Sequence, residues 1–196
     1  RVWMSVPLRV TYVEAERFAR ENLRWIAQQR EKIKHTCPVD TNLQTGTVLR
    51  LWGQPIQLQI EPAQSGPAVV REDDALRLFV PAQDGPAACR AALESWFRAQ
   101  LTIALQDVCK RWELVVGQRA SSYHIRKMKT RWGSCSLKTR RICVNEQLVH
   151  EPPEWLGYVV VHELTHFLVP NHSQAFWTLM DGFYPNWRTI RRYMRK

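Results

Sequence analysis

The chain has 196 residues, 45% of them hydrophobic and nine of them tryptophan, which is enough to bury a core as one domain or two small lobes and argues against disorder. It holds no uncharged apolar run of about 18 residues or more, which argues against a membrane span. The net charge of +10 gathers from Arg126 to Arg141 and in the last nine residues; it suits phosphates or an acidic surface, although a solvated basic face without a partner is an equal alternative.

The first part of the chain is predicted to be rich in strands. Short strands are expected at residues 2–6 and 8–10, followed by an amphipathic helix over residues 13–34. Residues 48–60 alternate apolar and polar side chains around a Gly-Gln-Pro turn, which predicts a hairpin, and residues 68–80 supply one or two more strands.

A long helix opens the second part. Its apolar residues, from Leu93 to Trp112, recur at spacings of three and four. Three short extended segments follow, at residues 123–128, 130–136 and 141–148. A helix then starts at Pro152 and Pro153, since proline is tolerated in a first helical turn, and runs to about Val169.

The end of the chain is predicted to be helical as well. Pro170 and Asn171 break the preceding helix, Ser173 caps a helix over residues 174–183, and a last helical turn follows Pro185. The expected fold class is α+β, with an N-terminal β-rich lobe containing one helix (residues 1–85) and a second lobe (residues 86–196) built on a small sheet, a central helix and C-terminal helices.

The cysteines indicate a cellular compartment rather than a site. The chain has five of them, an odd number, widely spaced and without a CxxC pair. Reduced thiols fit this pattern better than a disulfide framework, so a cytoplasmic protein is expected.

Polar, titratable residues stand out in the stretch VVVHELTHFLVPNHSQAFW. His162 and His166 lie one turn apart on one face of the expected helix, and Glu163 lies about 100° round from His162. The rest of this helix is apolar almost all round, so it must be buried. Burying a carboxylate and two imidazoles costs several kcal/mol unless they are compensated, and a divalent metal would supply the compensation.

This is the HExxH arrangement, in which two imidazoles bind zinc and the glutamate activates a zinc-bound water. Glu163 is therefore the expected general base, and His162 and His166 are expected ligands. A catalytic zinc takes a third protein ligand. His172, after the helix break, is favoured for this role, and Asp181 is the alternative because it is the one acid downstream of Glu163.

The sequences MKTRWGSCS and ICVNEQLVHEPPEWLGYVVVHELTHFLVPNHSQAFW resemble the YgjP-type family of zinc-dependent metallopeptidases. That family is related to SprT/Spartan-like proteases and to the small zincins called minigluzincins. The resemblance, strongest over residues 123–193, implies a zincin-like catalytic lobe, zinc as the cofactor, His162, His166 and His172 as its ligands, and Glu163 as the catalytic base.

The segment from Arg131 to Ser134 is a candidate for binding substrate. Gly133 allows close approach of a backbone, and a strand just before the active-site helix could add an extended peptide at its edge, with Trp132 as a wall of the cleft. A purely structural strand is the alternative. An oxyanion could be stabilised by Arg131, Lys129, Tyr158 or Tyr184, and sequence does not select among them.

Three functions remain open at this point. The favoured one is a zinc metallopeptidase acting on a protein or peptide. The second is a metal-dependent UTP pyrophosphatase, an assignment that some members of the resembled family carry, with the basic stretch from Arg126 to Arg141 holding the nucleotide. The third is a nucleic-acid-associated SprT-like protease or a binding module stabilised by zinc.

Overall fold

The computed structural model describes residues 11–23 and 43–194, and the chain divides into two compact units, residues 1–40 and 41–196. Helix α1 (Tyr12–Glu21) lies in the first unit. It starts with a capping box, because Thr11 Oγ1 accepts from the Glu14 amide and the Glu14 carboxylate accepts from the Thr11 amide at 2.9 Å. The helix expected over residues 13–34 is confirmed as far as Glu21, and Asn22 ends α1 earlier than expected. Residues 24–34 and the strands expected at 2–6 and 8–10 lie outside the described residues.

The second unit begins with a four-stranded sheet. Its strands are β1 (Val48–Leu51), β2 (Gln54–Ala63), β3 (Ala68–Glu72) and β4 (Ala75–Pro81), in the order β1-β2-β4-β3. β2 and β4 are parallel, and the other pairs are antiparallel. Alternate residues of these strands form the buried face, each worth about 1.5 to 3 kcal/mol when fully buried: Leu49, Leu51, Ile56, Leu58, Leu76 and Leu78.

The predicted hairpin is present, but its turn was placed wrongly. Leu51 pairs with Gln54, so Trp52 and Gly53 form a two-residue turn instead of Gly-Gln-Pro. Their φ angles are +52° and +78°, as in the turns whose twist matches that of the flanking strands. Tryptophan is not a usual residue for a positive φ, which is why the sequence did not reveal this turn.

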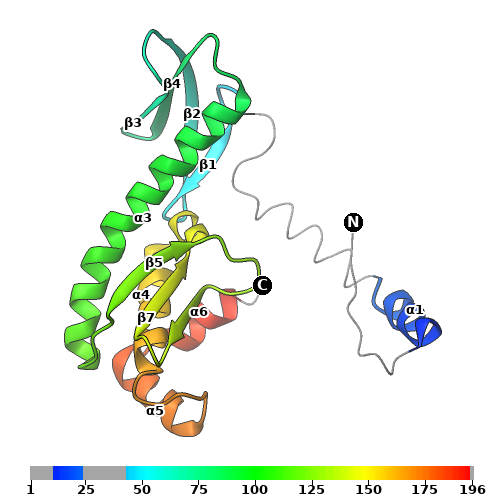
Figure 1. Cartoon of the computed structure of the whole chain (residues 1–196), viewed down its shortest axis with the longest axis vertical. Helices are drawn as coiled ribbons and strands as arrows, with labels where there is room; N and C mark the ends of the chain where they lie inside the picture. Colours follow the sequence, from blue (N-terminus) through cyan, green and yellow to red (C-terminus); the bar gives the residue numbers. More distant parts are fainter. Residues whose placement is uncertain (1–10, 24–42, 195–196) are drawn as a thin grey trace. The chain divides into compact units, whose positions relative to one another are not determined.

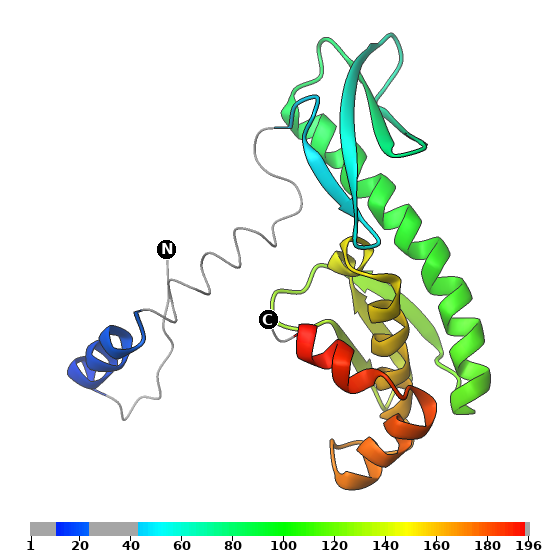
Figure 2. The same cartoon turned by 180° about the vertical axis from the view of Figure 1, so that it is seen from behind.

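Helix α3 (Pro86–Val116) is the long helix predicted from the spacing of its apolar residues. Pro86 occupies its first turn, and Gly117, with φ +68°, ends it by donating from its amide to the Glu113 carbonyl. Figures 1 and 2 show α3 running alongside both sheets of this unit. The boundary expected between residues 85 and 86 coincides with the start of α3 and stays a prediction.

A three-stranded sheet follows α3. It consists of β5 (Ser122–Arg126), β6 (Gly133–Ser136) and β7 (Arg141–Asn145) in the order β5-β7-β6, so β6 lies at one edge. β6 is antiparallel to β7, whereas β5 is parallel to it. The three predicted extended segments are therefore confirmed, except that the last one continues into a 3-10 helix, η1 (Glu146–His150).

Three helices complete the unit: α4 (Pro153–Thr165), α5 (Gln174–Phe183) and α6 (Trp187–Met194). α4 ends four residues earlier than predicted, and Ser173 occupies the cap position of α5 without a capping side-chain bond. The architecture is α+β, as predicted. None of the described helices is long and apolar enough to cross a membrane, and the four described cysteines form no disulfide.

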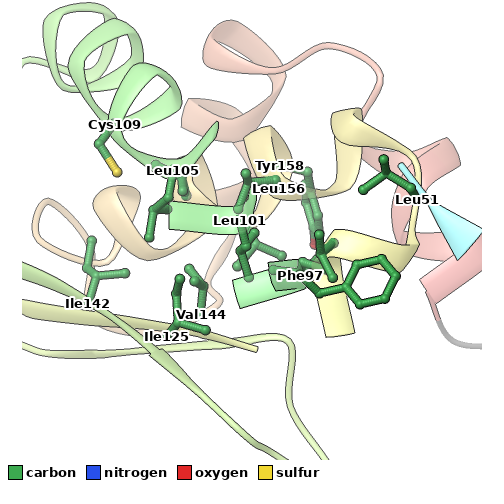
Figure 3. Packing of buried hydrophobic residues seen from close by; sticks show 14 of the residues in the cluster. Leu51, Phe97, Leu101, Leu105, Cys109, Ile125, Ile142, Val144, Leu156 and Tyr158 are labelled. Carbon is green, nitrogen blue, oxygen red and sulfur yellow. The ribbon is translucent and has the colours of Figure 1, made fainter. Parts of the chain in front are cut away.

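The two sheets share one hydrophobic core. Leu101, Leu105 and Cys109 of α3 lie over Ile142 and neighbouring side chains of the three-stranded sheet, as Figure 3 shows. Phe97, one turn earlier in α3, belongs to the same cluster as the four-stranded sheet. α4 is buried against α3, the three-stranded sheet and the two last helices, which fixes the position of the side chains that it carries.

The β1–β2 hairpin is fastened to η1 through backbone groups. The Trp52 amide donates to the Val149 carbonyl at 2.8 Å, and the Gly53 amide donates to the His150 carbonyl at 3.2 Å. His150 Nδ1 in turn bonds the Arg50 carbonyl at 2.8 Å, and its ring packs edge-on against Phe97. His150 is thus structural, and burial lowers its pKa.

We expect Gly53→Ala to weaken this junction more than Gly46→Ala does. Both glycines have a positive φ, but a Cβ on Gly53 would lie 3.1 to 3.3 Å from Pro152, whereas one on Gly46 would meet nothing within 4 Å. The backbone strain costs about 1 to 2 kcal/mol in each variant, and the contact with Pro152 adds about 1 kcal/mol in Gly53→Ala alone. Urea denaturation of both variants measures the difference; equal losses would contradict close packing at Pro152.

Candidate active site

Three imidazoles converge at the end of α4. His162 lies in the last turn of α4, His166 caps the helix, and His172 lies in the loop before α5. One ligating atom from each lies within 4.8 Å of the others, and Nε2 of His162 is 2.9 Å from Nε2 of His172. In the described part of the chain, these residues form the one histidine, cysteine and acid cluster with metal-binding geometry.

The short loop after α4 explains how the third histidine reaches the first two. The His166 amide still bonds the His162 carbonyl at 3.3 Å, so both imidazoles keep their helical stacking. His166 Nδ1 lies 3.3 Å from the Val169 carbonyl. A carbonyl only accepts, so this bond places the proton on Nδ1 and leaves the Nε2 lone pair for the cluster. Ser173 then donates from its amide to Asn171 Oδ1 as the chain turns into α5.

Aromatic side chains of α5 and α6 pack beside the three histidines. Phe176 is fully buried and packs against all three imidazole rings, with centroids 4.6 to 4.9 Å apart. Trp177 stacks on His172 at 5.3 Å and 19°, and Trp187 stacks on Trp177 at 4.4 Å and 18°. These contacts restrict the ring of His172, which would otherwise be free to rotate in an exposed loop.

The electrostatics of the cluster suit a cation. Burial lowers the pKa of all three histidines, that of His162 to about 3, with help from the neighbouring imidazoles. The rings are therefore neutral at physiological pH, which is the form that ligates metals. His162 Nδ1 is buried and has no hydrogen-bond partner among the described residues. Three neutral imidazoles with converging nitrogens are the donor set that zinc takes in catalytic sites.

Glu163 is held in a narrow space between α4 and β6. Only 6% of the residue is exposed, and burial raises its pKa to about 7 although the Cys135 thiol and the charge of Arg131 oppose this shift. A Cβ on Gly133 would lie 2.7 Å from Glu163 Oε1 and 2.7 Å from Val159 Cγ1. Only glycine lets β6 approach the carboxylate so closely.

A cavity of about 310 Å³ opens beside this carboxylate. It is bounded by the segment before and at the start of β6, by α4 and by α6. The lining residues are Thr130, Trp132, Gly133, Tyr158, Val159, His162, Glu163, Arg191 and Met194. The carboxylate, one imidazole of the cluster and the edge strand therefore face the same space.

The four predicted substrate-binding residues differ in their position relative to the cavity. Trp132 and Gly133 line the cavity. The positive charge of Arg131 favours the ionised form of the Glu163 carboxyl and so opposes the rise of its pKa. Ser134 pairs with Cys143 in the sheet and is not among the lining residues.

Of the other residues considered from the sequence, one lies in the cavity and two lie outside the site. Asp181 is paired with Arg188 and accepts from Trp187 Nε1 at 2.7 Å, so it is outside the histidine cluster. Tyr184 donates to the Glu154 carbonyl at 2.9 Å and lines another cavity, whereas Tyr158 lies in the cleft.

Two lining residues that lie outside the predicted strand and the predicted active-site helix were missed from the sequence. Arg191 and Met194 belong to α6, roughly thirty residues beyond Glu163, and no motif marks them. The hydrogen bond from Trp132 Nε1 to the Met194 carbonyl, at 3.4 Å, brings this helix to the cleft. The one available signal was the cluster of basic residues near the end of the chain.

The buried carboxyl predicts a pH-dependent stability for the metal-free protein. The pKa of Glu163 rises from 4.5 in the unfolded chain to about 7 in the folded one, so its contribution is fully present below pH 4.5 and is lost as the pH rises through 7. Relative to Glu163→Gln, the wild type should lose about 2.5 kcal/mol of unfolding free energy between about pH 5 and 8.

Urea denaturation with chelator present measures this difference at each pH. Glu163→Gln keeps the same shape without a titrating group, so the histidines contribute equally to both curves. Parallel curves for the two proteins would contradict a carboxyl with a raised pKa.

Replacing Gly133 by alanine should disturb the same contact. The added Cβ forces Glu163 or β6 to move, and overpacking of this kind costs about 1 to 3 kcal/mol. Gly182→Ala is the matched control, because Gly182 lies inside α5 and its Cβ would meet nothing within 4 Å. That variant should keep or slightly gain stability. A Gly133→Ala protein as stable as the control would show that the strand can move away freely.

Comparison with known proteins gives these features a context. No curated protein matches the sequence. Two solved structures are similar to part of it: the metallopeptidase zymogens of Pyrococcus abyssi abylysin (21% identity, 46% of this chain and 90% of that chain, TM-score 0.43) and of Methanocaldococcus jannaschii jannalysin (24% identity, 46% and 86%, TM-score 0.41). The profile of the YgjP-like metallopeptidase domain matches residues 1–196. The chain therefore belongs to the YgjP-like metallopeptidase family.

Proposed function

We propose that this metallopeptidase cleaves peptide bonds with zinc held by His162, His166 and His172 and with Glu163 as the general base. The observation that carries the proposal is the convergence of three neutral imidazoles, within 4.8 Å of one another, beside a buried carboxylate. Membership of the family implies a metal cofactor, and the donor set favours zinc. Zinc, when bound, would polarise a substrate carbonyl and lower the pKa of water.

Glu163 has the properties that proton transfer requires. A general base works best when its pKa is near the working pH, and burial raises the pKa of this carboxyl to about 7. In this role Glu163 accepts a proton from the attacking water and then delivers it to the leaving amide nitrogen. Its close packing against Gly133 fixes the carboxylate in the wall of the cavity.

The edge strand β6 is the proposed binding site for the peptide backbone. β7 pairs with one side of β6, and the order of the sheet leaves the other side at the edge. An extended peptide can add to such an edge through main-chain hydrogen bonds. We assign this contact to Arg131, Trp132, Gly133 and Ser134, with Trp132 forming a wall of the cavity.

The two alternatives, a UTP pyrophosphatase and a nucleic-acid-associated protease or zinc-stabilised binding module, predict different results in the experiments below. A structural zinc needs a fourth protein ligand, and the cluster in the described chain has three members. UTP hydrolysis would use the same carboxylate with different groups on the substrate. All proposed site residues lie between positions 131 and 172, so we assign the peptidase site to the second predicted lobe, residues 86–196.

Metal content tests the ligands. The wild type should hold one zinc per chain, and His172→Ala should lose zinc affinity by tenfold or more, because two imidazole ligands would remain instead of three. His124→Ala, an exposed histidine on β5, is the matched control and should bind zinc as the wild type does. Titration against a chromogenic chelator measures both. Unchanged zinc affinity in His172→Ala would remove this residue from the site.

Glu163→Gln tests the base with two substrates in parallel. The zinc-loaded variant should cleave unfolded casein at least a thousandfold more slowly than the wild type, because the amide cannot accept the proton, and should bind zinc with similar affinity. The same pair is incubated with UTP, and pyrophosphate release is measured. Glu163-dependent UTP hydrolysis without casein cleavage would replace the peptidase proposal with the pyrophosphatase one.

A further inference from the structure

Arg140 ends the turn between β6 and β7, and its backbone has an uncommon conformation. Its φ is +49°, a value that residues other than glycine, asparagine and aspartate rarely adopt. Glycine would remove the strain at this position. A strained residue of this kind persists only when the surrounding contacts hold it, and such residues cluster at functional sites. We therefore expect the Arg140 side chain to make contacts that hold the turn in place.

The edge of the Arg140 guanidinium binds the segment that follows α3. Nε and Nη2 donate to the Arg119 carbonyl at 3.0 and 2.8 Å, and Nη2 also donates to Gln118 Oε1 at 3.0 Å. The Arg140 carbonyl accepts from the Ser121 amide at 2.8 Å. The backbone and the side chain of Arg140 thus both attach the β6–β7 turn to the segment that leads into β5.

The flat face of the same guanidinium contacts Phe167. The central carbon, Cζ, lies 4.2 Å from the centre of the Phe167 ring, which is a close cation–π contact. Hydrogen bonds use the edge of a guanidinium and stacking uses its face, so arginine can make both contacts at once. Phe167 is half-buried and also packs against the hydrophobic core. The position of its ring therefore depends on Arg140 as well as on the core.

Phe167 belongs to the turn that orients the imidazole of His166. The Phe167 amide donates to the Leu164 carbonyl, and the Val169 amide donates to the Thr165 carbonyl, both at 3.0 Å. His166 Nδ1 bonds the Val169 carbonyl at the other end of this turn. A histidine ligand keeps its orientation through the bond of its second ring nitrogen. A displaced Phe167 would shift the turn, and with it the carbonyl that holds His166.

We propose that Arg140 is a positioning residue for the metal site, which holds the turn after α4 through Phe167 and so keeps His166 oriented for zinc. This inference rests on the zinc ligands of the proposed function. It extends the site to a residue that lies outside the histidine cluster and outside the cavity beside Glu163.

Zinc affinity of Arg140→Gly, measured by competition with a chromogenic chelator, tests the inference. Glycine accepts the positive φ, so the turn keeps its backbone conformation while the contacts of the guanidinium are lost. The variant should bind zinc about tenfold more weakly than the wild type, as is usual when the support of a ligand is removed. Electrostatics alone predicts the opposite sign, because removal of a nearby cation favours the binding of Zn²⁺.

Two control variants separate positioning from a general loss of charge or stability. Lys138→Gln removes an exposed cation from the same turn. Gly53→Ala weakens the fold beside Pro152, at the opposite end of α4 from His166. Both variants should bind zinc as the wild type does. Arg140→Lys, which keeps the charge but lacks the planar fork, should retain only part of the wild-type affinity.

Phe167→Leu shows whether the effect passes through the aromatic ring. Leucine keeps an apolar side chain but offers no ring face to the guanidinium, so this variant should also lose zinc affinity. Because the two residues would act as one unit, the double variant should lose no more than the larger of the two single losses. Additive losses, or wild-type affinity in both single variants, would overturn the inference.

Zinc binding and peptide cleavage give separate readouts. Equal zinc affinity of the wild type and Arg140→Gly would overturn the inference and leave the peptidase proposal intact. Zinc affinity that depends on Arg140, in a protein that cleaves no peptide, would overturn the peptidase proposal alone. A wild type without zinc affinity would overturn both.

Discussion

The close approach of β6 to α4 is the constraint on which the rest of the site depends. α4 is a buried helix that carries a carboxylate with 6% of its surface exposed, and the backbone at Gly133 comes so near that a Cβ there would collide with it. This narrow space raises the pKa of Glu163. The same contact sets the edge of β6 beside the carboxylate, where a peptide would lie. Because Gly133 has no side chain, the proposed peptide-binding strand can lie directly beside the proposed general base.

The core and the site use opposite faces of the same helix. Val160, Val161 and Leu164 are fully buried, so α4 cannot rotate or slide without loss of packing. Its other face carries the two helical imidazoles, and the aromatic rings of Phe176 and Trp177 hold them and His172 from the side of α5. The packing of the core therefore keeps the three neutral imidazoles together.

α6 contributes the one positively charged residue that lines the cleft, Arg191. The hydrogen bond between Trp132 and the Met194 carbonyl brings the end of α6 to the start of β6. Arg191 therefore lies near His162 and His172, and its charge helps burial to lower their pKa values. The tryptophan stack that supports His172 is the same stack that holds this guanidinium. The aromatic contacts that support His172 therefore also fix the position of Arg191 in the wall of the cleft.

The amino-acid sequence by itself determined the elements of the second unit, the buried helix with its HExxH motif, and the third histidine, because helical periodicity, proline breaks and the cost of burying polar groups are local properties. It misplaced the hairpin turn at Trp52 and the end of α4, where tertiary contacts override local preference. Only the tertiary structure decided that Cys135 and Gly133 touch Glu163 and that Arg191 lines the cleft. These contacts join residues roughly thirty positions apart, and no pattern along the chain records which strand edge or helix end packs against the helix that bears the motif.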